Sequence, residues 1–217
     1  MSGMYDLHTH TILSDGEMLP IELIRRMAVT GYTTVAITDH VDASNAKSVL
    51  SALFQVRKSA QVFGVKLLCG VEITHVPPAE IAVLARSAKS AGADIVVVHG
   101  ETPVEPVAEG TNQAACSCKY VNVLAHPGLI TIKDAEAAAK NGIALEITSR
   151  GGHNRTNGHV VRTAKEAGCQ LVVDSDTHAP HDIMDKRAKN LVARGAGLSE
   201  KECKQVLSLN IDQLLAF

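Results

Sequence analysis

The residues best suited to chemistry in this chain are histidines and carboxylates that follow short apolar runs. Ten histidines are present, against three phenylalanines and three tyrosines. Histidine is a common metal ligand and the usual acid or base near neutral pH. His8 and His10 are two residues apart, as are Asp176 and His178, so each pair would face one side of an extended strand. The other residues at or just after such runs are Asp15, Asp39, His40, Glu72, His99, His126, Glu146 and Asp174.

A recurring local pattern must position these residues. A helical stretch ends at a glycine, and an apolar run that ends in an ionisable residue begins two or three positions later. Glycine suits the left-handed conformation that often follows a helix, and continuous apolar runs are typical of parallel strands buried on both faces. Seven strands are predicted, over 4–10, 33–40, 65–72, 93–101, 121–127, 143–148 and 169–178.

Helices are expected between these strands. Apolar residues at helical spacing predict helices over 20–30, 46–63, 78–91 and 132–141, and Ser199 with Glu202 predicts the start of a C-terminal helix. Segment 104–119 has the least clear pattern. Alternation of strand and helix without a linker predicts one parallel α/β domain over residues 1–217. We expect a distorted (β/α)7 TIM-like barrel, with an open doubly wound sheet as the alternative.

In such a barrel the carboxyl ends of all strands meet at one face, where active sites are built. Six of the seven predicted strands end in or near a histidine or carboxylate that could bind metal. Imidazole nitrogens combined with carboxylates suit Zn²⁺, Mn²⁺ or Fe²⁺. Nine candidates exceed the needs of one ion, so two or three divalent ions are expected, with Glu72 as the best bridging residue. The nine are His8, His10, Asp15, His40, Glu72, His99, His126, Asp176 and His178.

The chain also resembles the PHP (polymerase and histidinol phosphatase) domain family over nearly its whole length. The resemblance is carried by DLHTHTILSDG at the start, TDH at 38–40, GVE at 70–72, His99, His126 and SDTH at 175–178. It implies a (β/α)7 barrel with a trinuclear metal centre. By this resemblance His8, His10, Glu72 and Asp176 would hold one ion, and Glu72, His99 and His126 a second. Asp15, His40 and His178 would hold the third; position 15 is histidine in some members, so Asp15 could reshape this site.

Substrate-binding residues are expected in the loops at the same face. Arg150 and Arg155 lie in a loop rich in glycine and asparagine, where a guanidinium could grip a phosphate group. His75, His153 and His181 are further candidates for substrate contact, whereas His159 is expected to be structural. Asp15, His178 and Arg150 are predicted to act in catalysis. Glu146-Ile147-Thr148 departs from the histidinol phosphatase pattern, which commonly has asparagine after Glu-Ile, so the sequence does not single out histidinol phosphate as the substrate.

These features together predict a metal-dependent phosphoesterase, most simply a phosphomonoesterase of a small metabolite that uses a metal-bridging hydroxide as its nucleophile. A nuclease or polymerase-associated editing module is one alternative, and a non-catalytic metal-binding regulatory domain is another. The 21 basic and 23 acidic side chains and the lack of tryptophan disfavour a nucleic-acid partner.

The expected compartment follows from the termini and the cysteines. We expect no membrane segment and no signal peptide, because the chain has no long apolar run and begins MSGMYDLHTH. Five cysteines without a CxxC pair favour free thiols in a reducing cytoplasm.

Overall fold

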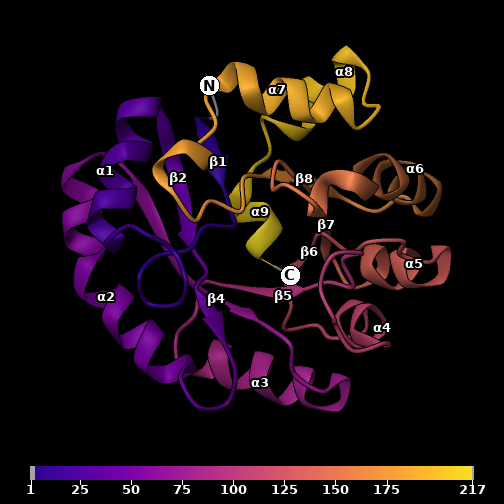
Figure 1. Cartoon of the computed structure of the whole chain (residues 1–217), viewed down its shortest axis with the longest axis horizontal. Coiled ribbons are helices and arrows are strands. Elements are labelled where there is room, and N and C mark those ends of the chain that lie inside the picture. Colours follow the sequence, from indigo (N-terminus) through magenta and orange to yellow (C-terminus); the bar gives the residue numbers. More distant parts are fainter. Residues whose placement is uncertain (1–2, 217) are drawn as a thin grey trace.

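Eight short parallel strands form the wall of a nearly closed barrel in the computed structural model, which describes residues 3–216 (Figure 1). The strands are β1 (Met4–Asp6), β2 (Tyr32–Ile37), β3 (His40–Val41), β4 (Lys66–Ile73), β5 (Ile95–His99), β6 (Val123–Ala125), β7 (Ala144–Thr148) and β8 (Leu171–Asp174). The order around the sheet is β1-β2-β4-β5-β6-β7-β8, with β3 paired to β4.

The predicted seven-stranded barrel is confirmed, because β2 and β3 are two halves of one predicted strand. Both pair with β4: Ile37 lies opposite Cys69, and His40 lies opposite Glu72. The strand is interrupted at Thr38, whose N–H donates instead to the carbonyl of Thr9 at 2.8 Å. The barrel closes where Thr9 bridges Thr177 in parallel, next to β1 and β8. The open doubly wound sheet is therefore excluded for the described part of the chain.

Helices lie around the barrel, and most of them connect one strand to the next, while the last three follow the final strand (Figure 1). They are α1 (Pro20–Thr30), α2 (Ala46–Val62), α3 (Pro78–Ser90), α4 (Thr111–Cys116), α5 (Ile132–Lys140), α6 (Asn157–Ala167), α7 (Lys186–Gly195), α8 (Glu200–Val206) and α9 (Ile211–Leu215), with 3-10 turns at His153–Thr156 and Pro180–Asp182. The unclear segment 104–119 contains only the six-residue α4. The first four predicted helices match α1, α2, α3 and α5 to within a residue or two.

The local sequence explains where the helices begin and end. Pro20 and Pro78 occupy first helical positions, where a missing N–H costs nothing. Gly31 and Gly168 follow α1 and α6 with φ of 100° and 66°, a conformation that strains other residues. Ser199 caps α8 through the backbone N–H of Glu202, and the Glu202 side chain in turn accepts from the backbone N–H of Ser199. The predicted capping box is thus present.

Two apolar clusters hold the fold together. The larger one lies between the strands and the surrounding helices. The smaller one fills the barrel with alternate strand residues such as Leu68 and Val97, and it includes Ile211 and Leu214 of α9. Asp212 of α9 pairs with Lys66 at the beginning of β4, so α9 covers the amino ends of the strands. The opposite, carboxyl end is thereby left for the polar residues.

All five cysteines are buried and none forms a disulfide. Across residues 3–216, no helix combines the length and apolar character needed to cross a bilayer.

Candidate metal centre

The structure brings all nine predicted ligands together at the carboxyl ends of the strands. His8 and His10 follow β1, His99 ends β5, His126 follows β6, and the others lie on β3, β4 and the loops after β1 and β8. Seven of the nine are buried; His40 is half-buried and Asp15 is exposed. Three groups of these residues place ligand atoms within 4.8 Å of one another.

The first group surrounds Glu72, the second-to-last residue of β4. Nε2 of His8 lies 3.3 Å from Oε1 of Glu72, and Nε2 of His10 lies 3.6 Å from Oε2 of the same carboxylate. Asp176 approaches from the other end of the chain, with Oδ1 3.3 Å from His10 Nε2. This group matches the set His8, His10, Glu72 and Asp176 inferred from the family resemblance.

The second group shares Glu72 and adds His99 and His126. Nε2 of His126 lies 3.7 Å from Oε1 of Glu72 and also 3.7 Å from Oδ2 of Asp176. Nδ1 of His99 contacts the carbonyl of Gly100 at 3.1 Å, which leaves its Nε2 facing the centre. Glu72 therefore lies between the first two groups, as a bridging residue would.

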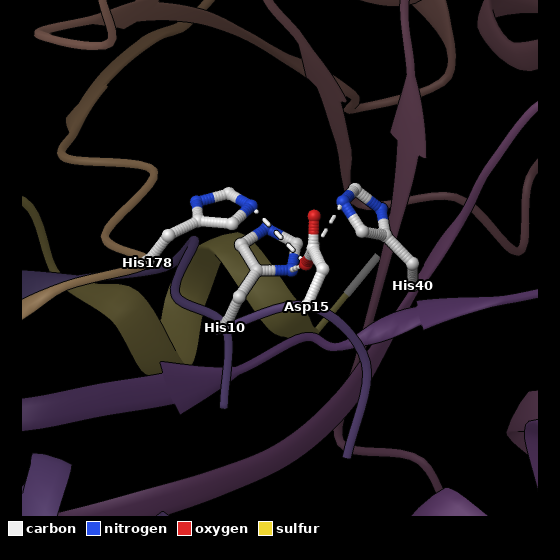
Figure 2. Close-up of side chains that lie close together, drawn as sticks. All are labelled: His10, Asp15, His40 and His178. Atoms are coloured by element: carbon white, nitrogen blue, oxygen red, sulfur yellow. Dashed lines mark ion pairs between the residues drawn. The ribbon is translucent and has the colours of Figure 1, made fainter. Parts of the chain in front are cut away.

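The third group is built around Asp15, whose carboxylate lies among three imidazole rings (Figure 2). Its Oδ1 is 3.2 Å from Nε2 of His178, 3.5 Å from Nε2 of His40 and 4.0 Å from Nδ1 of His10. The rings of His10 and His178 stack with centroids 4.2 Å apart. Nδ1 of His40 contacts Glu72 Oε2 at 2.7 Å, which joins this group to the other two.

The ligand atoms of the first two groups are better placed to bind divalent ions than to form hydrogen bonds with one another. Nε2 of His8 and Oε1 of Glu72 face each other at 3.3 Å, yet neither has a hydrogen-bond partner; the same is true of both ring nitrogens of His10. Buried polar atoms are rarely left unpaired in this way. Neutral imidazole nitrogens and carboxylate oxygens converging on one point are the ligands that Zn²⁺, Mn²⁺ and Fe²⁺ prefer.

The electrostatics of the centre also favour bound cations. Burial would lower the pKa of His8, but the carboxylates of Glu146, Glu72 and Asp176 raise it well above its usual value. Burial prevails at His10 and lowers its pKa to about 3. Despite burial, the neighbouring histidines hold the pKa values of Glu72 and Asp176 well below their usual range. The two central carboxylates are thus charged.

The backbone is strained at two of the candidate ligands. His126 and Asp176 have φ of 29° and 54°, in the left-handed region that non-glycine residues seldom adopt. Such strain persists only where the surroundings enforce it, and it clusters at functional sites. His75, in the loop after β4, has φ of 53° and is the third such residue among those described.

Carboxylates beneath the centre hold the ligands in place. Glu146 of β7 contacts Nδ1 of His8 at 2.8 Å and accepts the backbone N–H of His126 at 2.9 Å. Asp39 accepts from the backbone N–H and hydroxyl of Thr11 and from Ser14, which fixes the loop that carries Asp15. These are positioning contacts to the residues that would bind metal.

A buried lysine, which the sequence analysis did not single out, lies under the junction of β1 and β8. Lys189 of α7 is 3% exposed, and its ammonium lies 4.1 Å from the centre of the Tyr5 ring and bonds to the Tyr5 carbonyl. Burial lowers the pKa of Lys189, while Asp6 and Asp174 oppose this effect. The lysine sits four residues before buried Ala193 on the same helical face, which was the available sequence signal.

The predicted substrate-binding residues differ in their exposure and in their contacts. Arg150 is partly exposed and donates to Asp182 at 3.3 Å, and Asp182 also accepts the backbone N–H of His178. His153 is buried beside the second group, with its ring 4.2 Å from that of His126. The His181 side chain is 82% exposed, and that of Arg155 forms no hydrogen bond or ion pair within residues 3–216. The substrate-binding roles of these residues stay predictions.

One acidic residue near the centre was missed. Glu105, in the loop after β5, lies 3.1 Å from His99, 3.0 Å from His75 and 3.3 Å from His153. It lies in the segment whose pattern was least clear. His159 contacts the carbonyl of Ile130 at 2.8 Å, in keeping with its expected structural role.

Comparisons with known proteins agree with this picture of the fold. The family model described as RNase P subunit p30 matches residues 3–152. An uncharacterised protein of Methanocaldococcus jannaschii is 46% identical over 94% of this chain and 94% of its own length. A probable phosphatase of Shewanella piezotolerans is 30% identical over 85% of this chain and 82% of its own length.

Among solved structures, the histidinol phosphate phosphatase of Lactococcus lactis, crystallised with zinc, L-histidinol and phosphate, superposes with a TM-score of 0.63 at 16% identity. The match covers 90% of this chain and 94% of that one. The barrel fold expected from the motif resemblance is shared with this solved structure, whereas the p30 match was not anticipated. The chain belongs to the RNase P subunit p30 family, and its barrel fold is like that of the histidinol phosphate phosphatase.

Proposed function

We propose that this protein is a metal-dependent phosphoesterase, most simply a phosphomonoesterase that hydrolyses a small phosphorylated metabolite. The observation that carries the proposal is the convergence of six histidines with Asp15 and Glu72 in groups whose ligand atoms lie within 4.8 Å of one another, with Asp176 3.3 Å from His10. The Shewanella relative described as a probable phosphatase supports it. So does the fold likeness to a histidinol phosphate phosphatase.

Two or three divalent ions, of zinc, manganese or iron, suit this donor set. His8, His10, Glu72 and Asp176 would hold one, and Glu72, His99 and His126 another; Asp15, His40 and His178 would hold the third. Bound ions would activate a water molecule as the nucleophile and offset the negative charge of the phosphate oxygens.

The protein's own side chains then orient the ester. Arg150 lies at the rim within reach of Asp182, so its guanidinium is held close to His178. We assign it the binding of phosphate oxygens, because a guanidinium can donate two parallel hydrogen bonds to them. Asp15 and His178 lie 3.2 Å apart, and Asp15 is open to solvent. Where the third ion is not bound, this pair is suited to passing a proton to the departing alkoxide. His75, His153, His181 and Arg155 are assigned to the surrounding substrate contacts.

The test is hydrolysis of a panel of phosphomonoesters by protein loaded with Mn²⁺, Zn²⁺ or Fe²⁺. We expect the activity to disappear in His8→Ala and in Asp176→Ala. The matched control is His159→Asn, which changes a histidine that contacts Ile130, Arg162 and Thr163 and is not among the nine candidate ligands; it should keep full activity. Full activity in either ligand variant would show that the assignment of the site is wrong.

The family match favours one second candidate, a role on RNA. The region that matches the RNase P subunit p30 model contains seven of the nine candidate ligands but lacks Asp176 and His178. Cleavage of an oligoribonucleotide without hydrolysis of small phosphate esters would support a nuclease. Retention of metal with neither activity would support a non-catalytic subunit.

A further inference from the structure

The loop between β5 and α4 carries a carboxylate back to the metal centre. Glu105 lies in this loop and is 37% exposed, yet both of its oxygens face histidines. Oε2 lies 3.1 Å from Nε2 of His99 and 3.0 Å from Nε2 of His75, while Oε1 lies 3.3 Å from Nε2 of His153. Glu105 and His99 are also grouped with His75 as a set of possible metal ligands.

The orientation of the His99 ring and its distance from Glu105 are those expected of two ligands of one ion. The Nδ1 atom of His99 is taken up by the Gly100 carbonyl, so Nε2 is the atom left for an ion. In a tetrahedral site with Zn–N bonds of about 2.0 Å, two ligand atoms of one ion lie about 3.3 Å apart. The 3.1 Å between Nε2 of His99 and Oε2 of Glu105 is close to this value. It is also close to the 3.3 Å between His8 and Glu72 in the first group.

The neighbours of Glu105 hold it in this position. His153 is buried, and its Nδ1 contacts the hydroxyl of Thr102 at 2.8 Å, so its Nε2 is directed at Glu105. His75 approaches the other oxygen from the strained backbone position after β4. A carboxylate whose two oxygens already contact histidines loses little additional conformational freedom when it binds an ion.

Charge gives an independent reason for a second carboxylate here. Glu72, His99 and His126 offer one negative charge, and Glu72 is shared with the first group, which also has Asp176. Asp176 approaches only on the His126 side, with Oδ2 3.7 Å from Nε2 of His126, so a divalent ion here would lack a carboxylate on the His99 side. Among the described residues near His99, Glu105 supplies it.

We propose that Glu105 is a fourth protein ligand of the ion held by Glu72, His99 and His126, and that the loop it belongs to closes the coordination of that ion. This inference rests on the metal centre of the proposed function but not on its substrate. Four protein ligands are typical of a closed site, whereas a catalytic ion keeps a position open.

The experiment compares metal binding by Glu105→Gln and Glu109→Gln. Glu109 lies in the same loop and is exposed, so it is a matched control for loss of charge. Each protein is stripped with a chelator, its melting temperature is checked in the metal-free form, and Zn²⁺ or Co²⁺ is titrated back against a chromophoric chelator. Metal retained after gel filtration is counted by mass spectrometry, and the visible absorption of Co²⁺ reports on its ligands.

We expect Glu105→Gln to lose one metal equivalent, or to bind it at least about tenfold more weakly, with an altered Co²⁺ spectrum, while Glu109→Gln matches the wild type. Equal stoichiometry, affinity and spectra in the Glu105→Gln and wild-type proteins would overturn the proposal and reduce Glu105 to an ion-pair partner of the histidines. If the wild type binds metal but hydrolyses no phosphate ester, the proposed function fails, and the comparison of Glu105→Gln with the wild type still decides the role of this residue.

Discussion

The Nδ1 atom of His8 lies 2.8 Å from Oε1 of Glu146, deep in the barrel where both side chains are fully buried. This contact fixes the imidazole so that its other nitrogen, Nε2, points at Glu72 and Asp176. The second oxygen of Glu146 accepts the backbone N–H of His126. One carboxylate that need not touch an ion thus orients two residues that would.

Glu146→Gln should therefore weaken metal binding without unfolding the protein. A carboxylate that orients a ligating histidine typically contributes 10- to 100-fold to metal affinity, and we expect a loss of about that size. Competition with a chromophoric chelator measures it. Glu136→Gln, at an exposed position on α5, is the control. Unchanged affinity in Glu146→Gln would mean that His8 is oriented by packing alone.

Removal of metal should lower the thermal stability of the protein. The buried ligand atoms of His8, His10 and Glu72 lack hydrogen-bond partners, so a bound ion would satisfy them only in the folded state. Metal at about 1,000 times its dissociation constant would add about 4 kcal/mol. In a chain of this size, this stabilisation would raise the melting temperature by about 10 °C.

Thermal melting with and without EDTA measures this shift. The difference should shrink in His8→Ala, which lacks one ligand. Identical melting curves for the wild type in both buffers would count against a filled centre.

Arg150 and Arg155 should differ in their effect on catalysis, although both lie in the loop after β7. Arg150 is held near His178 through Asp182, whereas Arg155 is exposed and forms no such contact within the described chain. Loss of a hydrogen bond to a charged group costs about 1.5–3 kcal/mol, so Arg150→Ala should reduce kcat/KM for a phosphomonoester by about 10- to 100-fold. Arg155→Ala should reduce it by less, since Arg155 is assigned only to a surrounding substrate contact. Steady-state kinetics of both variants measures the two losses. A larger loss in Arg155→Ala would assign phosphate binding to Arg155 instead of Arg150.

Lys189→Met should destabilise the fold. Its ammonium is buried among Tyr5, Asp6 and Asp174, so a neutral side chain leaves buried carboxylates without their cation. Removing the cation from a group of buried charges costs on the order of 3–5 kcal/mol. Urea unfolding measures the loss, and Lys186→Met, exposed on the same helix, should remain within about 0.5 kcal/mol of the wild type. A stable Lys189→Met protein would indicate that Asp6 and Asp174 are protonated in the fold.

The barrel and the nine-residue cluster could be predicted because both follow from local rules. A glycine after each helix, a short apolar run and an ionisable residue at its end are visible in the sequence, and parallel topology brings those ends together. The interruption at Thr38 could not be predicted, since it depends on the Thr9 carbonyl, far away in sequence.

Glu105 and Lys189 escaped prediction for a related reason. The path of the loop after β5 decides where Glu105 points, and no periodic pattern specifies that path. Lys189 resembles an ordinary surface lysine until α7 is packed against the junction of β1 and β8, which turns it inward. Long-range packing, rather than local propensity, places both residues.

The closure of the barrel at Thr9 and Thr177 has a consequence for how the protein is made. His8 and His10 leave the ribosome before Asp176 and His178, which follow more than 160 residues later. A nascent chain can hold only part of the ligand set until its last strand has docked beside its first. A complete metal centre would therefore require that both ends of the barrel wall have been joined, and ion loading would be a late step in the maturation of each molecule.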